Sequence, residues 1–243
     1  AIPATDYYLD ELGVKKFALL GTDYVYPRTT NKILKQYLID KGIPETDIFV
    51  NYTPFGHSDW SKIVGDVVAL GADGKKVGVI STINGDANIG FYKELAAAGI
   101  KADDIPVVAF SVGEEELSGL DTKNLVGHLA AWNYFQSAES DLNTKFIKKW
   151  KAKMGDKRVT NDPMEAHVIG FEMYVKAVEK AGSTDVDAVR KAMYGIKVPN
   201  LTGGTAEMLP NHHLSKPVLI GEIKADGQFD ICLLYTSPSP RDE

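Results

Sequence analysis

The sequence contains one cysteine, Cys232, among its 243 residues. The chain therefore forms no internal disulfide, which fits an exported protein as well as a cytosolic one. Cys232 begins the last segment, residues 232–243, whose composition differs from that of the preceding chain. This segment resembles translated sequencing-adapter read-through, so we leave it out of the fold prediction. A natural tail rich in proline and serine is the alternative.

Long apolar runs and an excess of positive charge are also missing. No stretch approaches the roughly 20 apolar residues that a membrane-spanning helix requires. The chain has 27 Lys and Arg against 33 Asp and Glu, a formal net charge of −6, and its basic residues are scattered along the sequence. This balance argues against a nucleic-acid-binding protein. No basic and apolar leader precedes Ala1, but we expect the chain to start inside a longer protein, so this absence does not decide the compartment.

The first half of the chain repeats a strand, a loop and an amphipathic helix. Hydrophobic residues make up 44% and charged residues 25%, as in ordinary globular proteins. A helix is predicted between Ala1 and Gly13, and four short apolar runs after it predict buried parallel strands. The predicted strands are residues 17–20, 48–50, 77–80 and 107–110. This alternation predicts an α/β fold with a doubly wound parallel sheet.

Four loops follow the carboxyl ends of these predicted strands. In open parallel sheets, ligands bind in the crevice outside those ends. The loops to inspect are residues 21–28, 53–58, 81–86 and 111–116. Ser58, in the second loop, is predicted to cap the helix that follows it.

The second half of the chain does not continue the alternation of strands and helices. After a predicted strand within residues 125–131, three helices follow with no strand between them, and residues 218–220 and 228–231 flank a hairpin signal at Asp226-Gly227. Each helix has an apolar stripe that must be buried, while the first sheet has helices of its own. We therefore infer a second lobe whose sheet lies upstream of Ala1. A single mixed domain with a helical cap is the alternative.

Five separate segments, in a consistent order, resemble one family. They are GTDYVYPRTTN at 21–31, NGDAN at 84–88, HLAAWNYFQ at 128–136, VTNDPMEA at 159–166 and NHHLSK at 211–216. The chain resembles the type 1 periplasmic binding proteins over essentially all of residues 1–231. Within them it is most similar to the urea and short-chain-amide branch, which is related to the branched-chain amino-acid binders.

The resemblance implies two α/β lobes joined by three crossovers, which close on a ligand like a hinged trap. Residues 1–131 would form most of the C-terminal lobe, 132–200 the helices of an N-terminal lobe whose sheet is missing, and 201–231 a return segment. The implied function is the periplasmic or surface-anchored substrate-binding component of an ABC importer, which delivers urea or a short amide to a membrane permease. No catalysis, cofactor, metal or nucleic acid is implied. Because half of the site is absent, we expect weak binding by this chain alone.

A urea site needs acceptors for four N–H groups, a donor for one carbonyl, and apolar or aromatic walls. Tyr24 and Tyr26 resemble the cleft tyrosines of the family and could supply a wall and a hydroxyl group, or could simply pack in the core. Asn84 and Asp86 lie in the third loop, where Asp86 could accept N–H bonds or cap the helix that begins at Ala87.

Two further residues are candidates. Arg28 could brace its loop through a buried ion pair or contact the ligand. Glu114 occupies the position where amino-acid-binding relatives place an acid against the ligand ammonium group. It could equally belong to a solvated helix start, which the helix dipole would favour.

Two other functions stay open. An intracellular amide-sensing regulator could use the same fold, and an amide hydrolase would need a nucleophile and a base in the cleft. Residues 56–60 lack the second glycine of a nucleophile elbow, and the adjacent His212 and His213 lack a matched third metal ligand. The aromatic segment 132–135 is predicted to pack a lobe crossover.

Overall fold

A computed structural model describes residues 1–235, and their side chains as far as Cys232. The chain divides into two compact units. Unit 1 comprises Ala1–Trp132 and Ile220–Cys232, and the described part of unit 2 is mainly Asn133–Leu219. Most of the expected non-native tail, residues 236–243, lies outside the described residues, whereas residues 232–235 continue the last strand.

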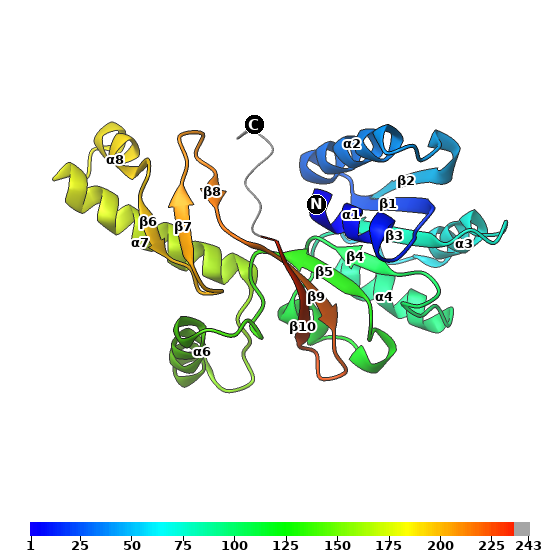
Figure 1. Cartoon of the computed structure of the whole chain (residues 1–243). Coiled ribbons are helices and arrows are strands. Elements are labelled where there is room, and N and C mark those ends of the chain that lie inside the picture. Colours follow the sequence, from blue (N-terminus) through cyan, green and yellow to red (C-terminus); the bar gives the residue numbers. More distant parts are fainter. Residues whose placement is uncertain (236–243) are drawn as a thin grey trace. The chain divides into compact units, whose positions relative to one another are not determined.

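Unit 1 is built on a seven-stranded sheet with the order β10-β9-β5-β4-β3-β1-β2 (Figure 1). The strands are β1 (Lys16–Thr22), β2 (Ile48–Thr53), β3 (Val77–Thr82), β4 (Val107–Ala109), β5 (Leu129–Trp132), β9 (Val218–Ile223) and β10 (Phe229–Tyr235). Strands β1 to β5 pair in parallel. The predicted α/β class with a doubly wound parallel sheet is confirmed.

Helices α1 (Ile2–Asp10), α2 (Val25–Asp40), α3 (Ser61–Leu70) and α4 (Ala87–Ala97) pack on this sheet. Tyr8 of α1 is fully buried, and its hydroxyl donates a 3.2 Å hydrogen bond to the carbonyl of Val79. Its ring lies directly over Gly78, where a Cβ atom would come within 2.8 Å of it. Glycine at position 78 therefore permits the close approach of α1 to β3.

Several predicted boundaries shift. The strand predicted within residues 125–131 begins only at Leu129 and runs to Trp132, because residues 125–128 form a turn in which the amide of His128 donates to the carbonyl of Leu125. The prediction that Ser58 caps α3 is wrong, since α3 begins at Ser61. The carboxylate of Asp59 instead accepts hydrogen bonds from the amide and the hydroxyl of Ser61.

The predicted hairpin at Asp226-Gly227 is confirmed. Strands β9 and β10 are neighbours at one edge of the sheet. Gly227 has a φ of 76°, which only glycine adopts without strain, and its amide donates to the carbonyl of Lys224. The turn therefore has the chemistry that the dipeptide indicates.

Unit 2 contains α6 (Asp141–Met154), α7 (Asp162–Ala181) and α8 (Val186–Met193), as the helical patterns predict. It also contains a three-stranded antiparallel sheet that the sequence did not predict, with β6 (Lys197–Pro199), β7 (Thr205–Met208) and β8 (Leu214–Ser215). These strands have three, four and two residues, which is too short for a periodic signal.

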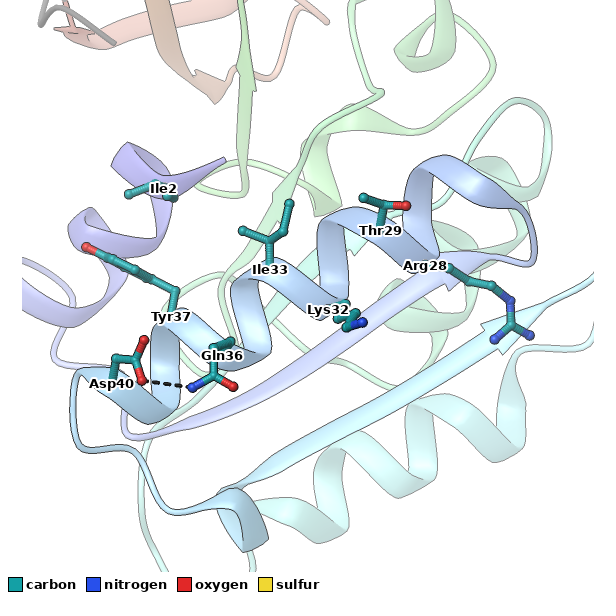
Figure 2. Close-up of a pocket in the computed structure, with 8 residues that line it drawn as sticks. All are labelled: Ile2, Arg28, Thr29, Lys32, Ile33, Gln36, Tyr37 and Asp40. Atoms are coloured by element: carbon teal, nitrogen blue, oxygen red, sulfur yellow. Dashed lines mark hydrogen bonds between the residues drawn. The ribbon is translucent and has the colours of Figure 1, made fainter. Parts of the chain in front are cut away.

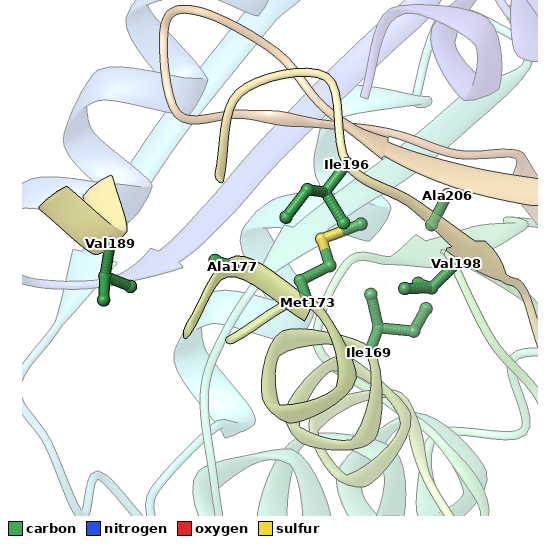
Figure 3. Close-up of a cluster of buried hydrophobic side chains, with 7 residues drawn as sticks. All are labelled: Ile169, Met173, Ala177, Val189, Ile196, Val198 and Ala206. Atoms are coloured by element: carbon green, nitrogen blue, oxygen red, sulfur yellow. The ribbon is translucent and has the colours of Figure 1, made fainter. Parts of the chain in front are cut away.

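One face of α7 packs on this small sheet. Figure 3 shows Ile169, Met173 and Ala177 of α7 turned toward residues of α8 and the sheet. The buried cluster is completed by Val189, Ile196, Val198 and Ala206. Part of the apolar surface of α7 is therefore covered by this chain itself.

Candidate ligand-binding site

The carboxyl ends of three neighbouring strands of unit 1 carry threonines at the same level. Thr22 of β1 is in register with Thr53 of β2, and Gly21 is in register with Thr82 of β3. The loops that follow these strands therefore start side by side. This edge of the sheet is the candidate site, and we call it the carboxyl edge.

Hydrogen bonds tie these loops to the strand ends. The amide of Asn84 donates to Thr22 Oγ1 over 3.0 Å, and its side chain donates to the carbonyl of Thr82 over 3.0 Å. The amide of Asp23 donates to the carbonyl of Thr53 over 2.7 Å. Backbone positions at the carboxyl edge are therefore held by neighbouring strands, and Asn84 is fixed by both of its nitrogen donors.

Aromatic side chains gather over the first two loops. The ring of Tyr24 lies 5.0 Å from that of Phe55 and 6.1 Å from that of Tyr26. The phenol of Tyr26 is hydrogen-bonded to the side chain of Ser111, and burial raises the pKa of Tyr26. The Ser111 bond links the first turn of α2 to the loop after β4. The site thus has an aromatic wall with one anchored hydroxyl group.

Carboxylates follow the ends of the next two strands, with Asp86 after β3 and Glu116 after β4. The Oε2 atom of Glu116 accepts a 2.8 Å hydrogen bond from the amide of Gly113. Burial raises the pKa of Glu116, and the negative charges of Glu115 and Asp86 add smaller contributions to this rise. Trp132, at the end of β5, lies against Gly113, where a Cβ atom would come within 3.2 Å of the indole ring. The edge therefore combines hydrogen-bond acceptors with a second aromatic side chain.

Charges of one sign dominate these loops. Residues 22–24, 53–60, 82–86 and 110–116 contain six carboxylates, and the nearby Arg28 forms an ion pair with one of them, Asp23. A half-site of this kind suits a ligand that presents N–H donors and disfavours a carboxylate at the same place.

The candidate residues Tyr24, Tyr26, Asn84 and Asp86 lie at the carboxyl edge. The two tyrosines are half-buried, so neither is a pure core residue. Asp86 occupies the N-cap position of α4, but its side chain makes no capping bond and is exposed. Its carboxylate is therefore available to other donors.

For Arg28 and Glu114 the structure corrects one of the two alternatives, and their contact with a ligand stays a prediction. Arg28 does form an ion pair, with Nε 2.5 Å from Asp23 Oδ1, but both side chains are exposed rather than buried. Its guanidinium also lies 4.7 Å from the centre of the Tyr52 ring. Glu114 is 2% exposed and begins the short helix α5 (Glu114–Leu117), so the interpretation as a solvated helix start is wrong for this residue. The pattern of three consecutive glutamates did not reveal which one turns inward.

Sequence reasoning missed the roles of Ser111, Glu116 and Trp132. The position of Ser111 just after the fourth predicted strand was the only available signal for it. Trp132 was predicted to pack at the crossover together with residues 133–135. Tyr134 and Phe135 are fully buried, as packing requires, but Trp132 is only half-buried.

A separate hollow of about 780 Å³ lies along α2 (Figure 2). It is lined by Ile2 of α1 and by residues of α2: Arg28, Thr29, Lys32, Ile33, Gln36, Tyr37 and Asp40. Gln36 and Asp40 hydrogen-bond to each other on its wall. Because the hollow lacks the strand-end groups, we do not assign the ligand site to it.

Comparison with known families gives a match to the periplasmic binding protein domain over residues 1–240. The chain belongs to this family. A Leu/Ile/Val-binding protein homolog of Brucella melitensis is 24% identical over 218 residues, which are 88% of this chain and 54% of that protein. A protein named limonene hydroxylase, from Geobacillus stearothermophilus, is 31% identical over 121 residues, which are 50% of this chain and 22% of that protein.

The fold is also that of solved members of this family. A solute-binding protein of an ABC transporter from Rhodopseudomonas palustris HaA2, in complex with p-hydroxybenzoic acid, superposes with a TM-score of 0.81 at 22% identity. The superposition covers 98% of this chain and 64% of that protein. The chain therefore spans between about half and two thirds of the length of these binding-protein relatives. Among the described residues, no helix is long and apolar enough to cross a bilayer.

Proposed function

We propose that this chain belongs to the substrate-binding component of an ABC importer, and that the carboxyl edge forms one half of its ligand site. The observation that carries the proposal is the convergence of Tyr24, Tyr26, Asn84 and Asp86 at adjacent strand ends. Membership of the periplasmic binding protein domain family supports it. The protein would act in the periplasm or at the cell surface, deliver its ligand to a membrane permease, and perform no chemistry.

For the ligand, we propose urea or a short-chain amide. Asp86 and Glu116 supply acceptors for N–H groups, while Tyr24 and Trp132 supply flat walls. The acidic loops favour N–H donors over a ligand carboxylate. A site that pairs each polar atom of a small ligand also rejects analogues that leave its own buried groups unpaired. The resemblance of five sequence segments to the urea and amide branch supports the same choice.

Unit 2, in this proposal, supplies helices of a second lobe whose parallel sheet lies outside this sequence. Besides its buried face, α7 carries a second apolar stripe at positions 164, 168, 171 and 175, the spacing of one helix face. On this stripe Phe171 is 67% exposed and Val175 38% exposed. An apolar stripe on a helix is stabilised when another layer covers it. Ligand contacts from two lobes would then stabilise a closed form.

Calorimetric titration of the full-length protein tests this proposal. We expect binding of urea or acetamide, and no comparable binding of 4-hydroxybenzoate. The variant Asp86→Asn should weaken binding at least about tenfold, because an ionised acceptor is lost from the site. The matched control Asp226→Asn, on the exposed hairpin turn, should bind like the wild type. Tight binding of leucine or of an aromatic acid, with no response to any amide, would contradict the proposed ligand class.

A further inference from the structure

The lysines of the chain look scattered over the whole sequence, but they are concentrated locally on α6. Residues 141–158 contain seven lysines and arginines against two aspartates, whereas the whole chain has a net charge of −6. Five of these lysines lie on the helix itself: Lys145, Lys148, Lys149, Lys151 and Lys153. Within the part of the chain that the structure describes, none of the five forms an ion pair.

The spacing of these lysines places them together. Lys145 is followed by Lys148 at i+3 and Lys149 at i+4, so these three share one side of the helix, and Lys151, at i+3 from Lys148, lies at the edge of that side. We call this side the lysine face. Apolar residues occupy the other side at intervals of four, namely Leu142, Phe146, Trp150 and Met154. Lys148 and Lys151 lie opposite this apolar stripe, whereas Lys153, seven residues after Phe146, lies on the side of the stripe.

The lysine face is not explained by the stability of the helix. Lys151 and Lys153 lie in the last turn, where the helix dipole favours positive charge. Lys145, Lys148 and Lys149 lie earlier, and like charges three and four residues apart destabilise a helix. They are also exposed to solvent. A single-sign cluster that costs local stability, and that forms no ion pair with any other described residue, is a candidate surface for an external partner.

The helix that carries the lysine face is firmly anchored. Ser140 Oγ caps its start by accepting a 3.0 Å hydrogen bond from the amide of Asn143. Asn143 is 1% exposed, and its Oδ1 accepts a 2.7 Å hydrogen bond from the hydroxyl of the buried Tyr134. The lysine side chains therefore project from a fixed backbone, as a docking surface requires.

We propose that the lysine face docks the protein onto an acidic patch on the outward surface of the importer's membrane permease. The proposal rests on the proposed function, since only a transport component has such a partner. Complementary charge would speed the encounter and fix its orientation. The apolar stripe of α6 would stay free to pack within the second lobe, so the partner meets lysines rather than apolar side chains.

The test uses the full-length protein and its cognate importer, reconstituted in phosphatidylcholine vesicles. The triple variant K145E/K148E/K149E keeps good helix formers at exposed positions, so the fold should persist. We expect the protein concentration for half-maximal stimulation of ATP hydrolysis to rise at least about tenfold in this variant. Raising the salt from about 50 to about 300 mM should weaken the wild type and affect the variant little.

A control variant changes the net charge equally at other exposed helical lysines, K32E/K93E/K191E, and should stimulate like the wild type. The wild type and both variants should bind the ligand equally in calorimetry. A loss of docking to the importer can then be distinguished from a failure to bind urea or an amide. Equal stimulation by both variants would overturn the docking site. A second result would also overturn it: the wild type binds protein-free vesicles containing phosphatidylglycerol in a salt-sensitive way, and K145E/K148E/K149E does not. The lysine face would then bind lipid rather than the permease.

Discussion

Replacing Lys216 with methionine tests the buried ion pair of unit 2. Lys216 follows β8, and its Nζ contacts Oε2 of Glu165 in the first helical turns of α7. The side chain of Lys216 is 7% exposed and that of Glu165 is 0% exposed. The Oε1 atom of Glu165 has no hydrogen-bond partner among the described residues. The lysine is therefore the main compensation for this buried carboxylate.

The expected cost is large. Removal of one partner from a buried pair leaves an uncompensated charge and typically costs about 3–5 kcal/mol. For a chain of this size each kcal/mol lowers the melting temperature by about 2–4 °C, so unit 2 should melt between about 6 and 20 °C earlier. The control Lys224→Met breaks the exposed contact with Asp226, at 3.8 Å, and should cost less than about 1 kcal/mol.

The cost should also depend on pH. Burial raises the pKa of Glu165, and the charge of Lys216 opposes this rise. Without Lys216 the pKa of Glu165 in the folded state should rise further. A carboxyl group with a folded pKa above its unfolded value destabilises the fold as it ionises, so the deficit should be larger at about pH 8 than at about pH 5.

Urea denaturation of wild type, Lys216→Met and Lys224→Met at both pH values measures these effects. The double variant Glu165→Leu/Lys216→Met, which removes both charges, should recover much of the lost stability. Equal stability of Lys216→Met and wild type at the higher pH would refute the reasoning, because it would mean that Glu165 reaches water or another cation.

Two further predictions concern unit 1. Gly78→Ala would place a Cβ atom 2.8 Å from the ring of Tyr8 and should therefore lower the free energy of unfolding by about 1–3 kcal/mol. In the control Gly65→Ala, on α3, the new Cβ atom has nothing within 4 Å, so this substitution should stabilise the protein. Equal effects in urea denaturation would contradict the packing of α1 on β3. Burial lowers the pKa of His128 to about 4, so stability should fall as the pH drops below about 6.5 and the unfolded histidine gains its proton. His128→Gln should lose this component of the pH dependence, and an unchanged profile would contradict the buried, neutral histidine.

Much of unit 1 could be predicted because its signals are local. Runs such as residues 77–80 are apolar throughout, as strands buried on both faces must be, and they locate β1 to β4 without tertiary information. Parallel pairing of such strands brings their carboxyl ends together, so the loops holding Tyr24 and Asn84 could be chosen in advance. Asp226-Gly227 predicted its hairpin because a backbone with positive φ selects glycine.

The rest depended on contacts between segments distant in the sequence. Strands β6 to β8 are too short for any period and exist because Val198 and Ala206 cover Ile169 and Met173 of α7. Glu114 and Glu116 are identical in type and neighbouring in sequence, and only packing decides which one is buried. The sequence by itself determined the parallel sheet and which loops lie at its carboxyl edge, since both follow from hydrophobic pattern and strand polarity. Only the tertiary structure decided which side chains meet there, because burial and hydrogen bonding arise between elements rather than within them.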